Sequence, residues 1–118
     1  MTPEFKAQWV AALRSGEYEQ ARDAMRIGDS FCCLGVAAQL ADPSKWKDWE
    51  GFLGQQGWGG DYPTSFVALA RRIGLPLDFA KELALRNDGA EPYNRKHSFE
   101  EIADIIESTD LIKYRREF

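Results

Sequence analysis

The chain has 118 residues, of which 44% are hydrophobic and 29% are charged, and its formal net charge is -4. This length suits one hydrophobic core, so we expect residues 1–118 to form a single globular domain. The acidic balance supplies no overall positive field for nucleic acid or an anionic membrane. No apolar run reaches the roughly 18 to 20 residues of a membrane span, and no charged and apolar leader stands at the N-terminus, so we predict a cytoplasmic protein.

The first helix is predicted to begin at Pro3. Thr2 is a suitable cap, proline is favoured at the first helical position, and Ser15-Gly16 is a typical helix end. Between these signals, one face of the helix carries apolar residues at helical spacing, namely Phe5, Trp9, Val10 and Leu13.

The most apolar stretch is Phe31–Leu40, which holds both cysteines and ends before Asp42-Pro43. We interpret it as the end of a strand that leads into a buried helix. The preceding residues, Glu17–Asp29, fit either a polar helix or a short strand. The turn residues Ile27–Ser30 favour the strand, which would form a hairpin with the beginning of the apolar stretch.

The composition changes after Pro43, where aromatic residues alternate with glycines. A short strand is expected at Trp49–Leu53, followed by a glycine-rich loop, because this much glycine disfavours a helix. The aromatic residues either cover the core or form an exposed binding surface. They include Trp46, Trp49, Trp58 and Tyr62.

Three further helices are indicated in the second half of the chain. One begins at Pro63-Thr64 and ends at Gly74, and a shorter one runs from Phe79 to a turn at Asn87–Gly89. The last begins at Ser98, which with Glu101 forms a capping-box pattern. The fold class we predict is α+β, with about four helices packed around a small antiparallel β hairpin or sheet.

Cys32 and Cys33 are adjacent, so a disulfide between them would be strained, and we expect free thiols in a reducing compartment. Cys33 lies near the start of a helix, where the dipole favours a thiolate, and His97 is the only histidine that could serve as its base. The alternative is that both cysteines are core residues. The spaced ligand pairs of a metal site and the glycine loop of a phosphate site are both missing, so we expect neither metal nor cofactor.

The segment Ser98–Phe118 resembles the beginning of a helix-turn-helix unit, because an amphipathic helix is followed by Lys113, Arg115 and Arg116. A recognition helix would have to fit into the last eight to ten residues, and DNA readers usually carry a basic face. The acidic balance argues against this interpretation, so a nucleic acid polymer is not the partner we expect.

Several blocks together resemble a set of small proteins encoded by tailed bacteriophages and prophages. The blocks are Trp9–Gln20, Phe31–Val36, Asn87-Asp88 and Ser98–Glu107. Relative to that family, this chain carries an insertion, Glu91–His97, which weakens a role for His97 as a catalytic base. The resemblance implies a viral accessory protein, and proteins of this kind often block a host component, including defence proteins or their nucleotide signals.

We therefore expect a non-enzymatic binding protein or inhibitor that acts on a bacterial protein or on an anionic small molecule. The alternatives are a cysteine-dependent hydrolase or transferase that uses Cys33 and a DNA-binding protein that uses the C-terminal segment. A protein target would be anchored by the aromatic residues named above, and a homo-oligomer is expected if they are exposed. An anionic ligand would be held by arginines, with Arg22, Arg26, Arg71 and Arg72 as the candidates.

Overall fold

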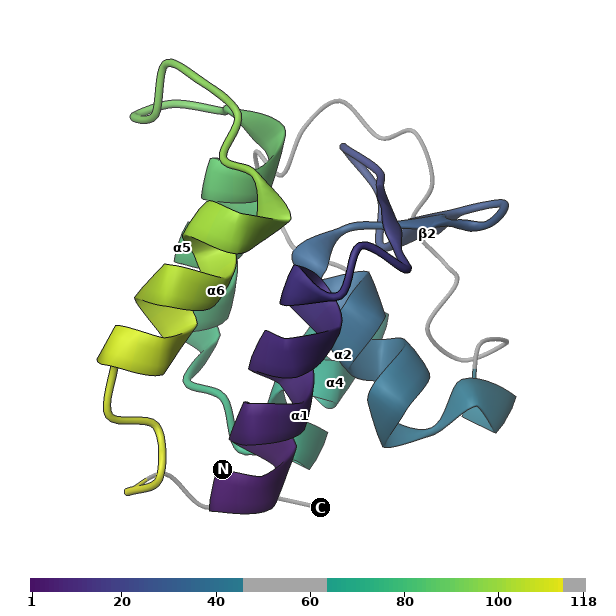
Figure 1. Ribbon diagram of the computed structural model, residues 1–118, viewed down its shortest axis with the longest axis vertical. Coiled ribbons are helices and arrows are strands. Elements are labelled where there is room, and N and C mark those ends of the chain that lie inside the picture. Colours follow the sequence, from purple (N-terminus) through teal and green to yellow (C-terminus); the bar gives the residue numbers. More distant parts are fainter. Residues whose placement is uncertain (46–63, 114–118) are drawn as a thin grey trace.

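The computed structural model describes residues 1–45 and 64–113 and has an α+β fold (Figure 1). Its helices are α1 (Pro3–Arg14), α2 (Cys33–Ala41), α4 (Thr64–Ile73), α5 (Leu77–Asp88) and α6 (Phe99–Ser108), with a short 3-10 helix η1 at Pro43–Lys45. The predicted class is confirmed. The described residues hold five α-helices rather than about four.

The sheet has three very short strands, β1 (Glu19–Gln20), β2 (Arg26–Ile27) and β3 (Ser30–Phe31), in the order β1-β3-β2. The predicted hairpin is confirmed, since β2 and β3 pair antiparallel around a two-residue turn. The prediction of a purely antiparallel element was wrong, because β1 pairs with β3 in parallel. The chain reverses once between β1 and β2 and again between β2 and β3, so the first and third strands run in the same direction.

Local capping explains where the helices begin and end. The Thr2 hydroxyl accepts a hydrogen bond from the amide of Phe5 at 3.1 Å, and Ser98 and Glu101 form the complete capping box at the start of α6. Gly89 follows α5 with a φ of 70°, a left-handed conformation that favours glycine. These predictions are confirmed. The turn predicted at Asn87–Gly89 is confirmed only at Gly89, because Asn87 and Asp88 belong to the last turn of α5.

The core lies between α1, α2 and the pair α5 and α6, and α1 packs along α6 in Figure 1. Trp9 is fully buried at its centre, and its indole nitrogen donates to the Cys33 carbonyl at 3.0 Å. The largest fully buried apolar side chains come from every α-helix and include Trp9, Leu34, Phe66, Leu69, Leu83, Ile102 and Ile106. Burial of one face of each helix stabilises the fold far more than the short sheet does.

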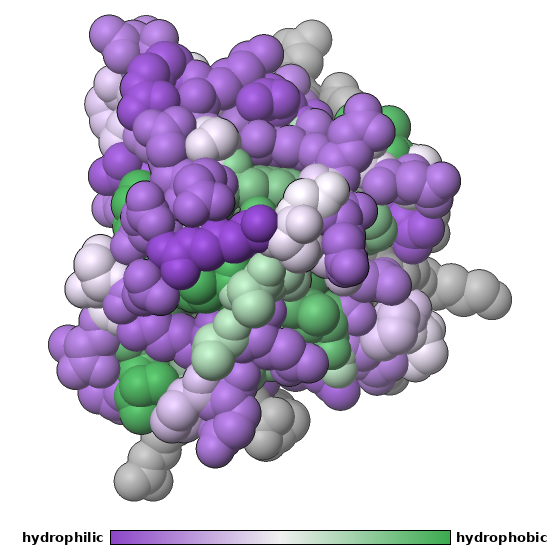
Figure 2. Space-filling model, viewed as in Figure 1, coloured by the Kyte–Doolittle hydropathy of each residue, from purple (hydrophilic) through white to green (hydrophobic). Residues whose placement is uncertain are grey.

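The face of the molecule seen in Figure 2 is mainly hydrophilic over the described residues. Among the large hydrophobic side chains described, those of Ile27 and Ile112 are exposed, at 51% and 42%. Within residues 1–45 and 64–113, none of the helices combines the length and hydropathy needed to cross a bilayer. The strand predicted at Trp49–Leu53 lies outside the described residues.

Candidate functional site

The two cysteines begin α2 and are completely buried. Cys32 occupies the cap position, where its sulfur accepts a hydrogen bond from the amide of Gly35 at 3.3 Å. The Cys33 thiol donates to the carbonyl of Leu83 at 3.7 Å. Burial raises the pKa of the Cys32 thiol to about 12 and raises the pKa of Cys33 well above its ordinary value. The dipole of α2 does not overcome this desolvation, so both thiols are protonated at neutral pH.

Gly35 accounts for another position of the Phe-Cys-Cys-Leu-Gly-Val block. A Cβ atom added there would lie 1.8 Å from the Met25 carbonyl oxygen, far inside van der Waals contact. The same carbonyl accepts a hydrogen bond from the Cys32 amide at 3.1 Å. The glycine therefore lets the start of α2 pack closely against the backbone of Met25, next to β2. This part of the block thus has a structural role.

Asn87 is the most highly connected polar side chain in the described interior. It is fully buried, and its carbonyl oxygen accepts hydrogen bonds from the Gln20 side chain at 2.8 Å and from the Cys33 amide at 3.3 Å. Its amide nitrogen donates to the Ala21 carbonyl and to Asp88 Oδ1, both at 2.9 Å. One side chain thus joins α5 to β1 and to the start of α2.

Asp88 extends this connection into the loop between β1 and β2. Its Oδ1 also accepts a hydrogen bond from the Asp23 amide at 3.0 Å. Asp23 has a φ of 64°, a left-handed conformation that aspartate tolerates better than most residues. Sequence reasoning missed this Asn-Asp pair as an interior feature. The signal available was two short polar residues directly before the glycine that ends an otherwise amphipathic helix.

His97 is connected to Asn87 through Gln20, whose side chain donates to both residues, and it is only 8% exposed. Its amide donates to the Arg86 carbonyl at 2.9 Å, its Nε2 lies 3.3 Å from an Arg86 guanidinium nitrogen, and its carbonyl accepts from Gln20. The Arg86 guanidinium also stacks on the Tyr93 ring at 4.3 Å. The imidazole therefore contacts Arg86, whereas the Cys33 thiol contacts the Leu83 carbonyl. The structure does not bring these two groups together as a nucleophile and its base.

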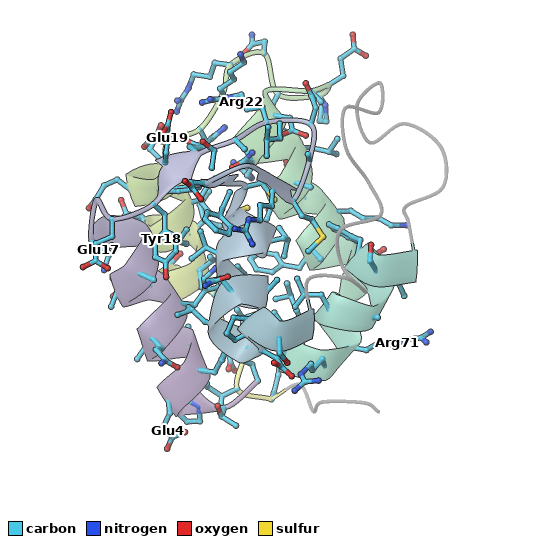
Figure 3. All side chains as sticks on the ribbon, turned by 90° about the vertical axis from the view of Figure 1, so that its right-hand side faces the viewer. Glu4, Glu17, Tyr18, Glu19, Arg22 and Arg71 are labelled. Carbon is cyan, nitrogen blue, oxygen red and sulfur yellow. The ribbon has the colours of Figure 1, made fainter. Side chains whose placement is uncertain are left out.

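The four candidate arginines lie in two separate regions. Arg22 and Arg26 belong to the loop and strand around β2, whereas Arg71 and Arg72 end α4, and Figure 3 shows Arg22 and Arg71 far apart. The arginines of the two regions also differ in their surroundings. The Arg26 guanidinium donates to the Gly28 carbonyl at 2.7 Å, and Arg71 is exposed. A single small anion cannot contact all four.

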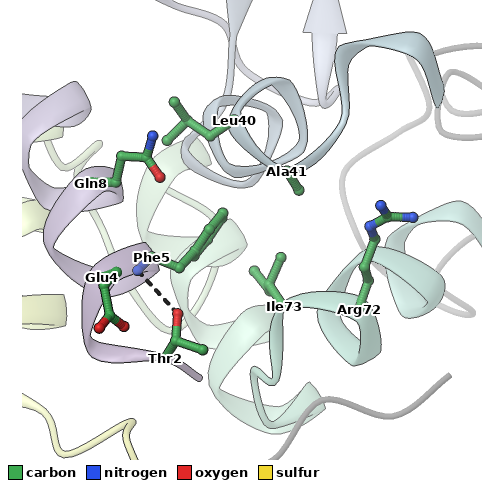
Figure 4. A pocket seen from close by; sticks show the side chains of 8 residues that line it. All are labelled: Thr2, Glu4, Phe5, Gln8, Leu40, Ala41, Arg72 and Ile73. Atoms are coloured by element: carbon green, nitrogen blue, oxygen red, sulfur yellow. Dashed lines mark hydrogen bonds between the residues drawn. The ribbon is translucent and has the colours of Figure 1, made fainter.

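A hollow of about 260 Å³ opens where the N-terminus of α1 meets the ends of α2 and α4 (Figure 4). Its walls include the apolar side chains of Phe5, Leu40 and Ile73. Glu4, Gln8 and Arg72 supply polar groups, and Arg72 forms an ion pair of 3.4 Å with Asp42. Of the predicted binding residues that the structure describes, only Arg72 lines this hollow. It lies there with Phe5, which was predicted on the apolar face of the first helix, and with Thr2, which was predicted as its cap.

The predicted aromatic anchors Trp46, Trp49, Trp58 and Tyr62 lie outside the described residues. Over the two described stretches, we find no group of three histidine, cysteine, aspartate or glutamate side chains that could hold a metal ion. After α6, the described chain continues only to Lys113, and Leu111 is buried there. Arg115 and Arg116, which belong to the helix-turn-helix hypothesis, also lie outside the described residues.

Comparison with known proteins gives a family but no function. No curated protein matches the chain, and no solved structure matches it. A family model with the description "domain of unknown function (DUF8296)" matches residues 1–64, which is more than half of the 118 residues. The matched part begins with α1 and includes the three strands and α2 with its buried cysteines. The chain therefore belongs to the DUF8296 family.

Proposed function

We propose that this chain is a phage-encoded binding protein without catalytic activity, which acts by occupying a component of the bacterial host. The viral origin rests on the resemblance of the Trp9–Gln20, Phe31–Val36 and Asn87-Asp88 blocks to small phage proteins. The observation that carries the non-catalytic part is the state of Cys32 and Cys33. Both thiols are completely buried and have raised pKa values, and a protonated thiol inside a core is a poor nucleophile.

A protein target is favoured over a sequestered nucleotide. Pockets that enclose a drug-sized ligand typically have volumes of about 300–1,000 Å³. The hollow beside Phe5 has about 260 Å³, which suits one anchor side chain of a partner better than a whole nucleotide. A larger depression of about 600 Å³ along α1 is lined mainly by apolar side chains, which do not bind phosphate groups. The separation of Arg22 from Arg71 also argues against one phosphate site built from the four arginines.

Native mass spectrometry of the protein recovered from bacterial cells tests this proposal. We expect an additional polypeptide mass that leaves on denaturation. Gln8→Trp places an indole at the hollow beside Phe5 and should reduce the fraction of the chain that carries this additional mass. Ala68→Trp, on the exposed side of α4, should leave that fraction unchanged. A bare chain in native spectra, together with an empty affinity capture from host lysate, would contradict binding by occupancy.

The rival cysteine-enzyme hypothesis is tested by alkylation. For a pKa of about 12, the thiolate fraction of Cys32 at pH 8 is on the order of 10⁻⁴. We therefore expect iodoacetamide to modify the folded protein far more slowly than the urea-unfolded protein. Rapid modification of Cys33 in the folded state would refute the proposal and favour the hydrolase or transferase.

A further inference from the structure

A second depression, which we call the α1 groove, runs along the outward side of α1 and has a volume of about 600 Å³. Its apolar lining includes Ala7, Val10 and Ala11, and Ile112 lines it beyond the end of α6. Figure 2 shows apolar residues reaching the surface at the middle of the face along which α1 runs in Figure 1. The lining also includes three charged side chains, Lys6, Arg14 and Glu107, so the α1 groove is an apolar strip with charged edges.

The shape of the α1 groove suits another helix. Ala7 and Ala11 are one helical turn apart and exposed, so the backbone of a second helix could approach α1 closely. The neighbouring Ile112 side chain is 42% exposed, although large apolar side chains are otherwise mostly covered in the described part of the chain. A helix with apolar residues at spacings of three and four would cover these side chains.

The charge beside the α1 groove defines the polar face of such a helix. Glu100, Asp104 and Glu107 form a row on the exposed face of α6, and their side chains are 66%, 64% and 62% exposed. A single guanidinium, that of Arg14, faces all three, at 3.6, 2.6 and 3.0 Å. The nearby Lys6 ammonium donates to the Thr109 carbonyl at 2.6 Å. Arg14 and Lys6, which both line the α1 groove, bring two positive charges against the three carboxylates, so the row keeps a net negative charge of one.

We propose that the α1 groove receives a basic amphipathic helix of a partner protein. Its apolar stripe would lie on Ala7, Val10 and Ala11, and its lysines or arginines would face the carboxylates of α6. Cations fit beside this row because they relieve the repulsion among its three carboxylates. A second copy of the chain fits less well, since it would bring its own acidic row. This inference rests on the proposed function and specifies the chemistry of the partner.

The test uses two labelled synthetic peptides of about 18 residues, long enough to form a helix on binding. One has leucines at helical spacing with lysines on the other face, and in the second glutamates replace the lysines. Fluorescence anisotropy with the full chain at about 0.15 M salt should show saturable binding of the lysine peptide only. Ala11→Arg should weaken this binding by about tenfold or more, because it adds bulk and positive charge at the centre of the α1 groove.

Two further variants make the outcome decisive. Ala68→Arg introduces the same side chain at an exposed position of α4 and should bind like the wild type. Asp104→Asn removes one carboxylate of the row and should weaken binding and reduce its salt sensitivity. Equal binding to Ala11→Arg and Ala68→Arg would overturn the assignment, as would equal binding of both peptides. So would a concentration-dependent dimer that Ala11→Arg abolishes.

Failure of this inference is distinguishable from failure of the proposed function. A host protein retained equally by the wild type and by Ala11→Arg would refute the α1 groove as its site and leave binding by occupancy intact. If neither peptide binds and native mass spectrometry shows a bare chain, both proposals fail.

Discussion

Replacing the buried Asn87 by alanine should destabilise the protein far more than the same substitution at an exposed asparagine. In Asn87→Ala, two buried backbone groups lose their partner: the Ala21 carbonyl, at 2.9 Å from the Asn87 amide nitrogen, and the Cys33 amide, at 3.3 Å from its oxygen. A buried polar group left unsatisfied costs about 1–3 kcal/mol. We therefore expect a loss of about 3–4 kcal/mol, with Gln20 finding water at its half-buried position.

That loss is large relative to the total stability of a domain of this size, which is typically about 5–15 kcal/mol. With about 2.1 cal/mol/K of unfolding entropy per residue, a 118-residue chain should lose roughly 12 °C in Tm for about 3 kcal/mol. Urea unfolding followed by circular dichroism gives the free energy directly. An unchanged m-value would show that the native fold, and not the unfolded state, is affected.

Two controls separate hydrogen bonding from general disruption. Asn94→Ala, at an exposed position of the loop between α5 and α6, should change the free energy of unfolding by no more than about 0.5 kcal/mol. Asn87→Asp keeps the volume but cannot donate to Ala21 and places a second carboxylate beside Asp88, so it should also be strongly destabilising. A loss below about 1 kcal/mol for Asn87→Ala would refute the role assigned to this side chain.

Gly35→Ala should destabilise the protein by about 3 kcal/mol or more, because the added Cβ would lie 1.8 Å from the Met25 carbonyl oxygen. Gly28→Ala is the matched control, since a Cβ there would meet no other atom. It should cost about 1 kcal/mol, because alanine disfavours the φ of 59° at this position. The hydrogen bond from Arg95 and the amide of Ser98 lower the pKa of Glu101 to about 2. Its contribution to stability is therefore present above the ordinary carboxyl pKa and lost as pH falls from about 5 to about 2, so the Tm difference between wild type and Glu101→Gln should narrow over this window. Ser98→Ala should cost about 1 kcal/mol in thermal unfolding, because it removes the cap of α6.

Each of these expectations has an opposing result. Equal melting temperatures for Gly35→Ala and Gly28→Ala would show that the start of α2 moves freely away from the strand. A Glu101 carboxyl that titrates at its ordinary pKa in NMR would exclude a persistent ion pair with Arg95. A neutral Ser98→Ala would mean that water satisfies the first turn of α6 equally well.

The helix boundaries were largely predictable because the relevant interactions are short in sequence. Thr2 and Ser98 each bond an amide three residues ahead, and Gly89 adopts its left-handed conformation directly after α5. Amphipathic spacing likewise identified the buried faces of α1 and α6. The parallel pairing of β1 with β3 was not predictable, since strands of two residues carry almost no periodic signal.

The candidate site was less accessible to sequence reasoning. Adjacent cysteines at the start of a helix fit both a reactive thiolate and a core residue, and only the packing around Cys33 shows that it is sealed. In the same way, four arginines in one acidic chain suggested a common anion site, but two of them lie in α4 and the other two lie in β2 and in the loop before it, in a different region. The tryptophans predicted as anchors lie outside the described residues, so their role stays a prediction.

The α+β class, most helix ends and the apolar character of α2 could be predicted from the sequence, because these depend on local hydrogen bonds and on the period of the hydrophobic residues. Tertiary structure alone decided that Asn87 is an interior connector and that the α6 carboxylates share Arg14. It also decided that apolar residues of α1 and Ile112 border one groove. Such features join residues more than 50 positions apart in the sequence, and a contact of that range depends on how the helices pack, which no local pattern encodes.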